Sequence, residues 1–242
     1  MKILLIIPCY NEEANIKRVY DQVCSYNAGH TQKYDMLFVN DGSTDRTEEL
    51  LGQYGMNHVS LVQNLGIGGG VQTGYKYAAR NGFDIAVQLD GDGQHDVACV
   101  EDIARPIVDG NADMVIGSRF VEGAAPGFRS SFLRRIGIKI ISLVIKIRTG
   151  KRISDATSGF RAVGRSLISE FSRAYPTEYP EPISSVSALL SGYRITEIPT
   201  RMREREGGVS SIRTWKTMYY MINVVLSILL AGRALHERTG IE

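Results

Sequence analysis

The sequence has few of the residues that crosslink a chain or bind zinc. Only three cysteines and four histidines occur among its 242 residues. Cys9, Cys24 and Cys99 lie far apart and show no metal-ligand spacing, which excludes a disulfide framework and a cysteine-based zinc site. We therefore interpret them as reduced thiols of a cytosolic protein.

The sequence also lacks an uninterrupted apolar run of about 18 residues, the length that indicates a transmembrane helix. Its most apolar stretch, "MYYMINVVLSILLAGRAL", is broken by Asn223, Ser227 and Arg233. We expect this segment to lie in a membrane interface, to pack on a partner subunit or to associate with its own copy. These alternatives stay open at this point.

Acidic residues are absent between Gly123 and Ser154, although the formal net charge of the chain is only +2. The basic residues of this stretch are Arg129, Arg134, Arg135, Lys139, Lys146, Arg148, Lys151 and Arg152. Residues 131–148 also carry an apolar stripe at helical spacing. Two interpretations are open, a core-packed helix with a solvated basic side and an interfacial helix attracted to anionic lipid. The small net charge gives no reason to expect a nucleic-acid partner.

Apolar segments typical of strands alternate with helical segments over the first half of the chain. The expected strands are residues 3–7, 36–39, 59–62, 85–89 and 113–116. This alternation predicts right-handed crossovers and a mostly parallel sheet flanked by helices. The second half is less regular, with helices expected near 131–148 and 165–173, a proline-rich loop at 175–182 and a strand in "YRITEIP". We expect one large domain with a nucleotide-type first half.

Polar clusters follow four of these strands: "PCYNEE", "NDGS", "NLG" and "QLDGDGQHD". Because ligands bind at the carboxyl ends of parallel strands, we expect the four clusters to meet at one edge of the sheet. Asp90 and Asp92 point the same way on an extended segment, and Gly91 lets the backbone approach a ligand closely. With Gln94 as a neutral oxygen donor, this set suits Mg²⁺ or Mn²⁺. The alternative interpretation is a polar turn.

The other clusters also have two interpretations. Asp41, followed by Gly42, either forms a turn with a helix cap or accepts hydrogen bonds from a nucleobase edge. The glycine-rich stretch "NLGIGGGVQTG" does not fit a dinucleotide-binding loop, because Gly66 and Gly68 are followed by Val71 and the stretch follows the third strand. It favours a helix that begins close to the sheet and to a sugar nucleotide.

Six blocks together resemble family 2 glycosyltransferases. The blocks are "IIPCYNEEANI", "VNDGSTDRT", "NLGIGGGVQTGY", "QLDGDGQHD", "VIGSRF" and "TSGFRA", in this order over roughly residues 1–200. They are most similar to the dolichol- and polyprenyl-phosphate sugar transferase branch and its bacterial polysaccharide relatives. The resemblance implies a GT-A fold, a nucleotide-sugar donor, a divalent cation and inversion at the anomeric carbon.

The resemblance also implies roles for particular residues. The donor-binding set is Pro8, Tyr10, Glu12, Asp41, Gly42, Asn64, Gly68, Asp90, Gly91, Arg119 and Arg203. The metal set is Asp90, Asp92 and Gln94. Arg119 and Arg161 resemble basic groups on the donor phosphate or the acceptor side. Arg203 lies in the basic loop "RMREREGGVSSIR", which is interpreted either as a lid over a diphosphate or as a solvated loop.

A hydroxyl acceptor needs a carboxylate to take its proton, whereas an ionised lipid phosphate does not. Asp155 and Glu181 are the candidate bases and, with Arg161, the candidate catalytic residues. Asp155 has an alternative role as a helix cap or as the ion-pair partner of Arg161, and Glu181 as a loop residue. Related sequences often carry a further acidic residue at the position of Ile183.

The sequence therefore predicts a hexosyltransferase that moves a sugar from a UDP-sugar, or GDP-mannose, to a polyprenyl phosphate or a lipid-linked glycan of polysaccharide synthesis. We expect a glycosyltransferase domain over residues 1–213, with a nucleotide-sugar half (1–120) and an acceptor half (121–213), followed by a C-terminal helix (214–242). The expected location is the inner face of the membrane, where an anionic surface, a small membrane protein or a second copy is the partner. The alternatives are a nucleotidyltransferase and a catalytically degenerate membrane adaptor.

Overall fold

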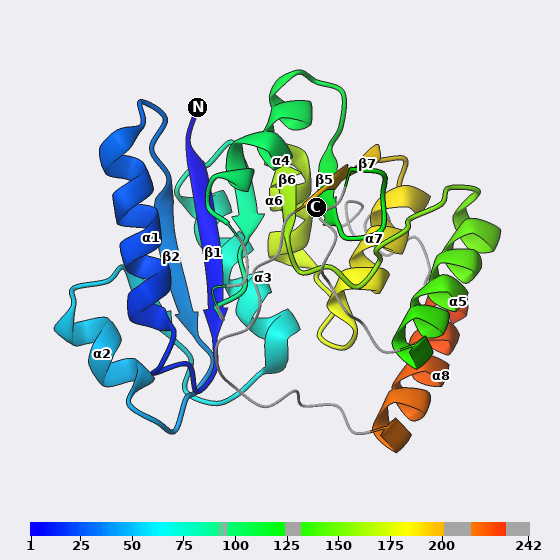
Figure 1. Cartoon of the computed structure of the whole chain (residues 1–242), viewed down its shortest axis with the longest axis horizontal. Coiled ribbons are helices and arrows are strands. Elements are labelled where there is room, and N and C mark those ends of the chain that lie inside the picture. Colours follow the sequence, from blue (N-terminus) through cyan, green and yellow to red (C-terminus); the bar gives the residue numbers. More distant parts are fainter. Residues whose placement is uncertain (92, 94–95, 124–131, 201–213, 231–242) are drawn as a thin grey trace, which may run out of the picture.

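The computed structural model describes residues 1–91, 93, 96–123, 132–200 and 214–230. Seven strands form one sheet in the order β3-β2-β1-β4-β6-β5-β7, with helices on both faces (Figure 1). The strands are β1 Ile3–Cys9, β2 Asp35–Asn40, β3 His58–Ser60, β4 Ile85–Gln88, β5 Met114–Ser118, β6 Arg161–Gly164 and β7 Ile195–Pro199. The helices are α1 Ile16–Gly29, α2 Thr47–Gln53, α3 Gly66–Arg80, α4 Cys99–Val108, α5 Phe132–Thr149, α6 Arg165–Arg173, α7 Pro180–Leu190 and α8 Thr214–Leu230.

The mostly parallel sheet expected from the sequence is confirmed. Strand β1 is buried along its whole length and pairs in parallel with β2 and β4. A strand covered on both faces reads as a continuous apolar run, which explains the sequence "ILLII". The register places Cys9 beside Asn40 and Ile6 beside Gln88, so the three strands end at the same edge.

Strand β6 is the element that the sequence pattern did not reveal. It is antiparallel to both β4 and β5, with Arg161 opposite Gln88 on one side and opposite Ile116 on the other. All four of its residues are buried. Its shortness and its buried arginine hide it from a pattern-based prediction, because a charged residue rarely begins a fully buried strand.

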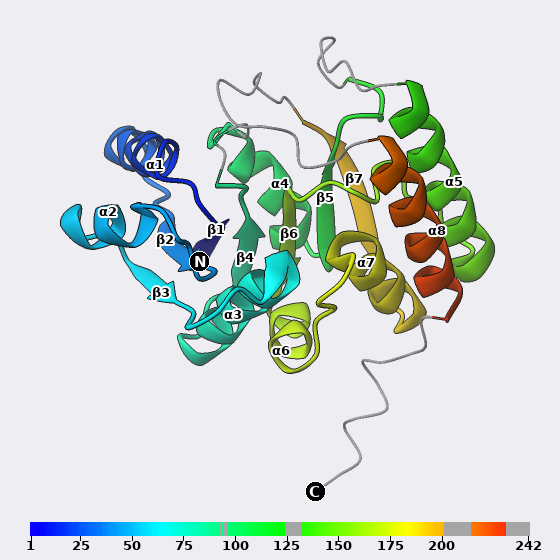
Figure 2. The ribbon, with the colours of Figure 1, turned by 90° about the horizontal axis from the view of Figure 1, so that it is seen from below.

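Helices cover the sheet in two layers (Figure 2). Helices α1 and α4 pack on one face, and α3, α6 and α7 pack on the other. Helices α5 and α8 lie side by side at the end of the sheet that carries β7, and α8 also contacts α7. The α3 layer is close to the sheet because Gly74 faces β1. A Cβ at Gly74 would lie 2.3 Å from Cγ2 of Ile6.

We expect Gly74→Ala to destabilise the fold by about 1–3 kcal/mol, because the added methyl overpacks the contact between α3 and β1. Urea unfolding would measure the change. Gly52→Ala in α2 is the matched control, since nothing lies within 4 Å of its added Cβ. The control should be neutral or stabilising by up to about 1 kcal/mol. Equal midpoints for the two variants would contradict this packing.

Candidate active site

The carboxyl ends of β1, β2 and β4 surround a cavity of about 440 Å³. It lies where the sheet order reverses, with β2 on one side of β1 and β4 on the other, the usual ligand position in such sheets. Its lining is Pro8, Cys9, Tyr10, Glu12, Asp41, Asn64, Gly66, Ile67, Gly70, Asp90 and Gly91. Most of the residues expected to bind the donor are therefore brought together, although they come from four separate segments.

The two remaining glycines of the donor-binding set lie against backbone. Gly42 has a φ of +68°, and a Cβ there would lie 2.8 Å from the backbone nitrogen of Asn64. A Cβ at Gly68 would lie 2.3 Å from the carbonyl oxygen of Pro176 and 2.6 Å from that of Thr177. Both glycines therefore allow close approach of neighbouring loops and do not themselves line the cavity.

Asp41 joins the end of β2 to the start of α3. Its carboxylate accepts a hydrogen bond of 2.7 Å from the backbone N–H of Leu65, and its side chain is almost fully buried. Burial raises the pKa of Asp41, while hydrogen bonds from the backbone of Leu65 and Gly66 lower it. Asp41 thus ties the end of β2 to the residue before α3 and lines the cavity, and it does not cap α2; its contact with a nucleobase stays a prediction.

The loop after β1 is fixed by the loop after β2. Asn11 has a φ of 55°, and its side-chain oxygen accepts a hydrogen bond of 2.8 Å from the backbone N–H of Thr44. The backbone N–H of Glu12 donates to the Thr47 hydroxyl at 3.0 Å. These contacts hold the neighbouring Tyr10 at the cavity with its side chain half-exposed. The sequence pattern favours Asn11 as the N-cap of the first helix, whereas α1 begins at Ile16 with Asn15 at the N-cap position, and Asn11 instead holds the loop after β2.

Asp90 lies on the cavity wall in unusually close contact with the segment before β6. A Cβ at Gly159 would lie 2.6 Å and 2.9 Å from the two carboxylate oxygens of Asp90. A Cβ at Gly91 would meet the carbonyl oxygen of Pro8 at 2.8 Å. Only glycine fits at position 91, where a Cβ would meet backbone, whereas a Cβ at position 159 would displace the Asp90 carboxylate. The importance of Gly159 was missed, because its contact partner is distant in sequence.

The expected metal ligands Asp92 and Gln94, and the expected donor contact Arg203, lie outside the described residues. Within the described part of the chain, no cluster of three or more histidine, cysteine, aspartate or glutamate side chains could hold a metal ion. The carboxylate of Asp90 itself suits a hard cation, because it presents oxygen ligands at the wall of a cavity. Asp90 can therefore contribute one oxygen ligand to a divalent ion.

Arg119 and Asp155 form a buried ion pair beyond the end of β5. The guanidinium donates to both carboxylate oxygens at 2.7 Å, and the backbone N–H of Arg119 donates to the same carboxylate at 3.0 Å. The two side chains are 7% and 0% exposed. The partner of Asp155 is thus Arg119, whereas the sequence analysis considered Arg161. Both oxygens of the Asp155 carboxylate thus accept hydrogen bonds from the Arg119 guanidinium.

Glu197 of β7 supports this ion pair. Its carboxylate accepts hydrogen bonds from the backbone N–H groups of Ser154 at 2.7 Å and Asp155 at 2.8 Å. The sequence analysis missed Glu197. The signal was weak, since a glutamate in a short strand is usually solvated.

Arg161 is completely buried, and its guanidinium points into the protein. It donates to the carbonyl oxygen of Ser158 from Nε at 3.1 Å and from Nη2 at 2.8 Å. Its Nη1 donates to the carbonyl oxygen of Glu181 at 3.0 Å and to the hydroxyls of Ser184 and Ser185 at 3.1 Å and 3.4 Å. This internal position differs from the one expected for a group that contacts the donor phosphate.

Glu181 lies in the first turn of α7, which begins within the expected proline-rich loop. Tyr179 has a left-handed φ of 49° and Pro180 is the first helical residue, a favoured position for proline. Burial raises the pKa of Glu181, the charge of Arg161 lowers it, and the charge of Asp90 raises it again. Glu181 is therefore close enough to both charges to respond electrostatically to them.

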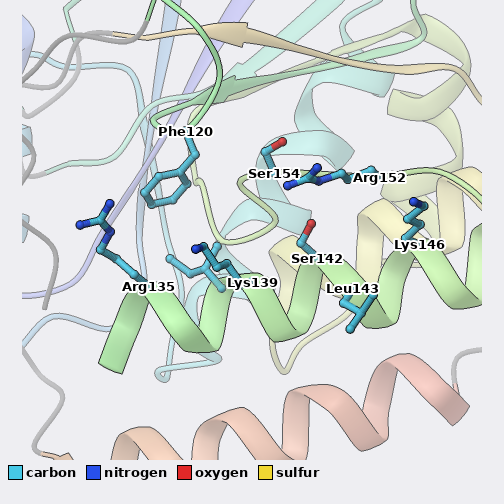
Figure 3. A pocket seen from close by; sticks show the side chains of 9 residues that line it. Phe120, Arg135, Lys139, Ser142, Leu143, Lys146, Arg152 and Ser154 are labelled. Atoms are coloured by element: carbon cyan, nitrogen blue, oxygen red, sulfur yellow. The ribbon is translucent and has the colours of Figure 1, made fainter. Parts of the chain in front are cut away.

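A second hollow, of about 530 Å³, lies beside α5 (Figure 3). Arg135, Lys139 and Lys146 rise from one face of α5 toward Phe120 and Arg152. The hollow is connected to the ion pair, because the Arg119 guanidinium lies 5.6 Å from the centre of the Phe120 ring. Four basic side chains thus line a groove that begins beside the Arg119–Asp155 ion pair.

The neighbouring face of α5 and one face of α8 are apolar and exposed. The exposed side chains are Ile136, Ile140, Leu143 and Ile147 on α5, and Ile222, Leu226, Leu229 and Leu230 on α8. We call this set the apolar stripe. Among the described helices, none combines the length and hydropathy of a transmembrane span. In the stripe expected within residues 131–148, Ile136, Ile140, Leu143 and Ile147 are exposed, whereas α5 packs on the core through Ile141 and Ile145.

Comparison with known proteins decides the family. The model of glycosyl transferase family 2 matches residues 4–171. The chain belongs to this family. It is therefore a glycosyltransferase, and this result excludes the nucleotidyltransferase alternative.

Two relatives of this family 2 glycosyltransferase have names that refer to polyprenyl-type lipids. It is 28% identical to a UDP-N-acetylglucosamine–dolichyl-phosphate N-acetylglucosaminyltransferase of Methanococcus voltae, covering 98% of this chain and 96% of the relative. It is 30% identical to a polyprenol monophosphomannose synthase of Mycolicibacterium smegmatis, covering 86% and 80%. These relatives lie in the polyprenyl-phosphate sugar transferase branch, as the resemblance implied.

The fold of the glycosyltransferase also occurs in solved structures. Glucosyl-3-phosphoglycerate synthase from Mycobacterium tuberculosis, crystallised with Mn²⁺, UDP-glucose and phosphoglyceric acid, has a TM-score of 0.66 at 19% identity. The similarity covers 94% of this chain and 78% of that one. It confirms the expected GT-A fold.

We expect Asp155→Asn to destabilise the protein by about 3–5 kcal/mol, because it leaves the Arg119 guanidinium buried without its countercharge. Urea unfolding would measure the loss. Glu101→Gln is the control, since the Glu101–Arg105 pair is more than half exposed on both sides. The control should change stability by less than about 1 kcal/mol. A loss below 1 kcal/mol for Asp155→Asn would show that the pair is not structural.

Proposed function

We propose that this glycosyltransferase moves a sugar from a nucleotide sugar to polyprenyl phosphate at a membrane surface. The observation that carries the proposal is the cavity at the strand ends, with the Asp90 carboxylate on its wall and a groove of basic side chains nearby. A UDP-sugar is the favoured donor, because one relative is named for UDP-N-acetylglucosamine and a structural neighbour was crystallised with UDP-glucose. GDP-mannose is second, supported by the relative named as a mannose-transferring synthase.

The donor would occupy the cavity with its nucleoside between the loops after β1 and β2. Pro8, Tyr10, Glu12 and Asp41 line that part of the cavity. The half-exposed ring of Tyr10 offers a stacking surface, and the carboxylate of Asp41 is an acceptor for a base N–H. Asn64 and Gly91 complete the wall nearer the diphosphate.

Asp90, Asp92 and Gln94 would hold Mn²⁺ or Mg²⁺. When bound, such a cation neutralises the negative charge that grows on the leaving diphosphate. The Asp90 carboxylate lies against the backbone of Gly159, where an added Cβ would come within 2.6 Å of one of its oxygens. Structural neighbours crystallised with UDP and either Mn²⁺ or Mg²⁺ support this choice of ion.

In the reaction, an oxygen of the acceptor phosphate forms a bond to the anomeric carbon. The bond from that carbon to the diphosphate oxygen breaks on the opposite face, and its electron pair leaves with the nucleoside diphosphate. Arg119 would stabilise charge at this edge, and Asp155 keeps its guanidinium oriented. The acceptor phosphate is already ionised, so no general base is required. Glu181 would serve as the base only for a hydroxyl acceptor.

The membrane surface is the proposed partner of α5 and α8. The apolar stripe lies next to the basic groove, an arrangement that suits insertion below the headgroups together with attraction to anionic lipid. We therefore propose a peripheral protein on the inner face of the membrane. Residues 214–242 would form the membrane-facing helix after a glycosyltransferase domain of residues 1–213. A small membrane protein or a second copy on the apolar stripe is the alternative partner.

We expect release of UDP or GDP to depend on Mn²⁺ and on polyprenyl phosphate, and to fall by about 100-fold or more in Asp92→Ala. Asp109→Asn, an exposed change at the end of α4, is the control and should leave turnover unchanged. A thermal-shift screen of nucleotide sugars with and without Mn²⁺ would identify the donor, since only a ligand of the folded state raises the melting temperature. Unchanged turnover in Asp92→Ala would refute the metal assignment.

We expect the protein to co-sediment with phosphatidylglycerol vesicles more strongly than with phosphatidylcholine vesicles. Lys139→Glu with Lys146→Glu should weaken binding to the anionic vesicles by about 10-fold or more, because each basic residue contributes about 1 kcal/mol. Leu143→Glu should weaken binding to both vesicle types. Val62→Glu is the control, since Val62 is fully exposed and lies outside the apolar stripe. Equal binding by all variants would point to a protein partner.

A further inference from the structure

The segment from Asp155 to Arg161 contacts three separate parts of the site. Its first residue pairs with Arg119 beyond β5. The hydroxyl of Ser158 donates to the carbonyl oxygen of Gly117 at the end of β5, at 2.6 Å. Gly159 lies directly against the carboxylate of Asp90. Its last residue reaches the start of α7.

Arg161 fixes this segment from inside the protein. The five hydrogen bonds that its guanidinium makes within the described residues all go to carbonyl or hydroxyl oxygens. Two of them hold the carbonyl of Ser158, the residue next to Gly159. The others hold the first turn of α7 through the carbonyl of Glu181 and the hydroxyls of Ser184 and Ser185.

The shape of the guanidinium explains why this position needs arginine. Its planar fork presents several donors in fixed directions, so one side chain can hold two backbone carbonyls and two hydroxyls at once. An ammonium group has three donors on a compact centre and cannot span both the Ser158 carbonyl and α7. Burying a charge is costly, and a fully buried cation without a direct carboxylate partner adds little to stability. A role in positioning accounts for its presence better than a role in stability.

The contact between Gly159 and Asp90 carries this positioning to the cavity. Because a Cβ at Gly159 would meet both oxygens of Asp90 at 2.6 Å and 2.9 Å, the backbone of residues 158–159 forms a surface on which the carboxylate rests. A displacement of this surface by a few tenths of an ångström would turn the carboxylate. Metal and catalytic sites tolerate errors of only about 0.5 Å in ligand position.

We propose that Arg161 is a positioning residue that sets the orientation of the Asp90 carboxylate through Ser158 and Gly159, and links it to the α7 turn that carries Glu181. This inference rests on the proposed function, in which Asp90 holds a divalent cation under the donor diphosphate. It assigns Arg161 no contact with the donor. In this proposal one guanidinium positions both the backbone under Asp90 and the first turn of α7.

Isothermal titration of UDP and GDP, each with and without Mn²⁺, would test the proposal on the full chain. Gly159→Ala should weaken the Mn²⁺-dependent part of nucleotide binding by about 10- to 100-fold, as changes in residues that orient metal ligands do. Binding without Mn²⁺ should stay within two-fold of wild type. Gly29→Ala is the matched control, because nothing lies within 4 Å of its added Cβ.

Arg161→Lys should show the same selective loss, with exposed Arg165→Lys as its control. If Arg161→Lys does not fold, Ser184→Ala with Ser185→Ala tests Arg161 in its place, because it removes two acceptors of the guanidinium and should show the same selective loss. A wild-type protein that binds neither nucleotide with Mn²⁺ would refute the proposed function. Suppose that the wild-type protein binds a nucleotide with Mn²⁺ and that the Gly159→Ala variant shows the same Mn²⁺ dependence of nucleotide binding. This result would refute the positioning role and would not affect the proposed function.

Discussion

The antiparallel strand β6 joins the two halves of the sheet, and the site depends on it. On one side it pairs with β4, which leads into Asp90, and on the other with β5, which leads into Arg119. The segment that enters β6 therefore passes between the two halves at the carboxyl edge. That passage places Gly159 under the Asp90 carboxylate and Asp155 beside the Arg119 guanidinium.

The charges of the site follow a simple division. The carboxylates of Asp41 and Asp90 line the cavity at the strand ends. Two arginines of the neighbouring segments are already engaged, Arg119 by Asp155 and Arg161 by backbone carbonyls. These hydrogen bonds fix the positions of the two guanidinium groups before the reaction. A group held in place needs no rearrangement when charge develops in the transition state. Arg135, Lys139 and Lys146 lie on α5 and line a separate hollow, where an anionic surface can reach them.

Local sequence patterns predicted the parallel half of the fold well. The runs before Pro8 and Asn40 are apolar and continuous, the run before Asp90 is interrupted only by Gln88, and the strands that they predict end at one edge as expected. The same approach missed β6, which has four residues and begins with a charged one. It also placed Pro180 in a loop, although proline at the first turn of a helix is compatible with α7. In both cases the deciding contacts are made with distant parts of the chain.

The sequence by itself determined which residue types stand at the strand ends, and hence the family and the class of chemistry. Periodicity and strand-end composition are local properties, so they can be read before folding. Only the tertiary structure decided that Asp155 pairs with Arg119, 36 residues away, and that the guanidinium of Arg161 points inward to α7. The sequence contains several carboxylates and arginines that could pair with one another. The position of β6 in the sheet determines which of them come into contact.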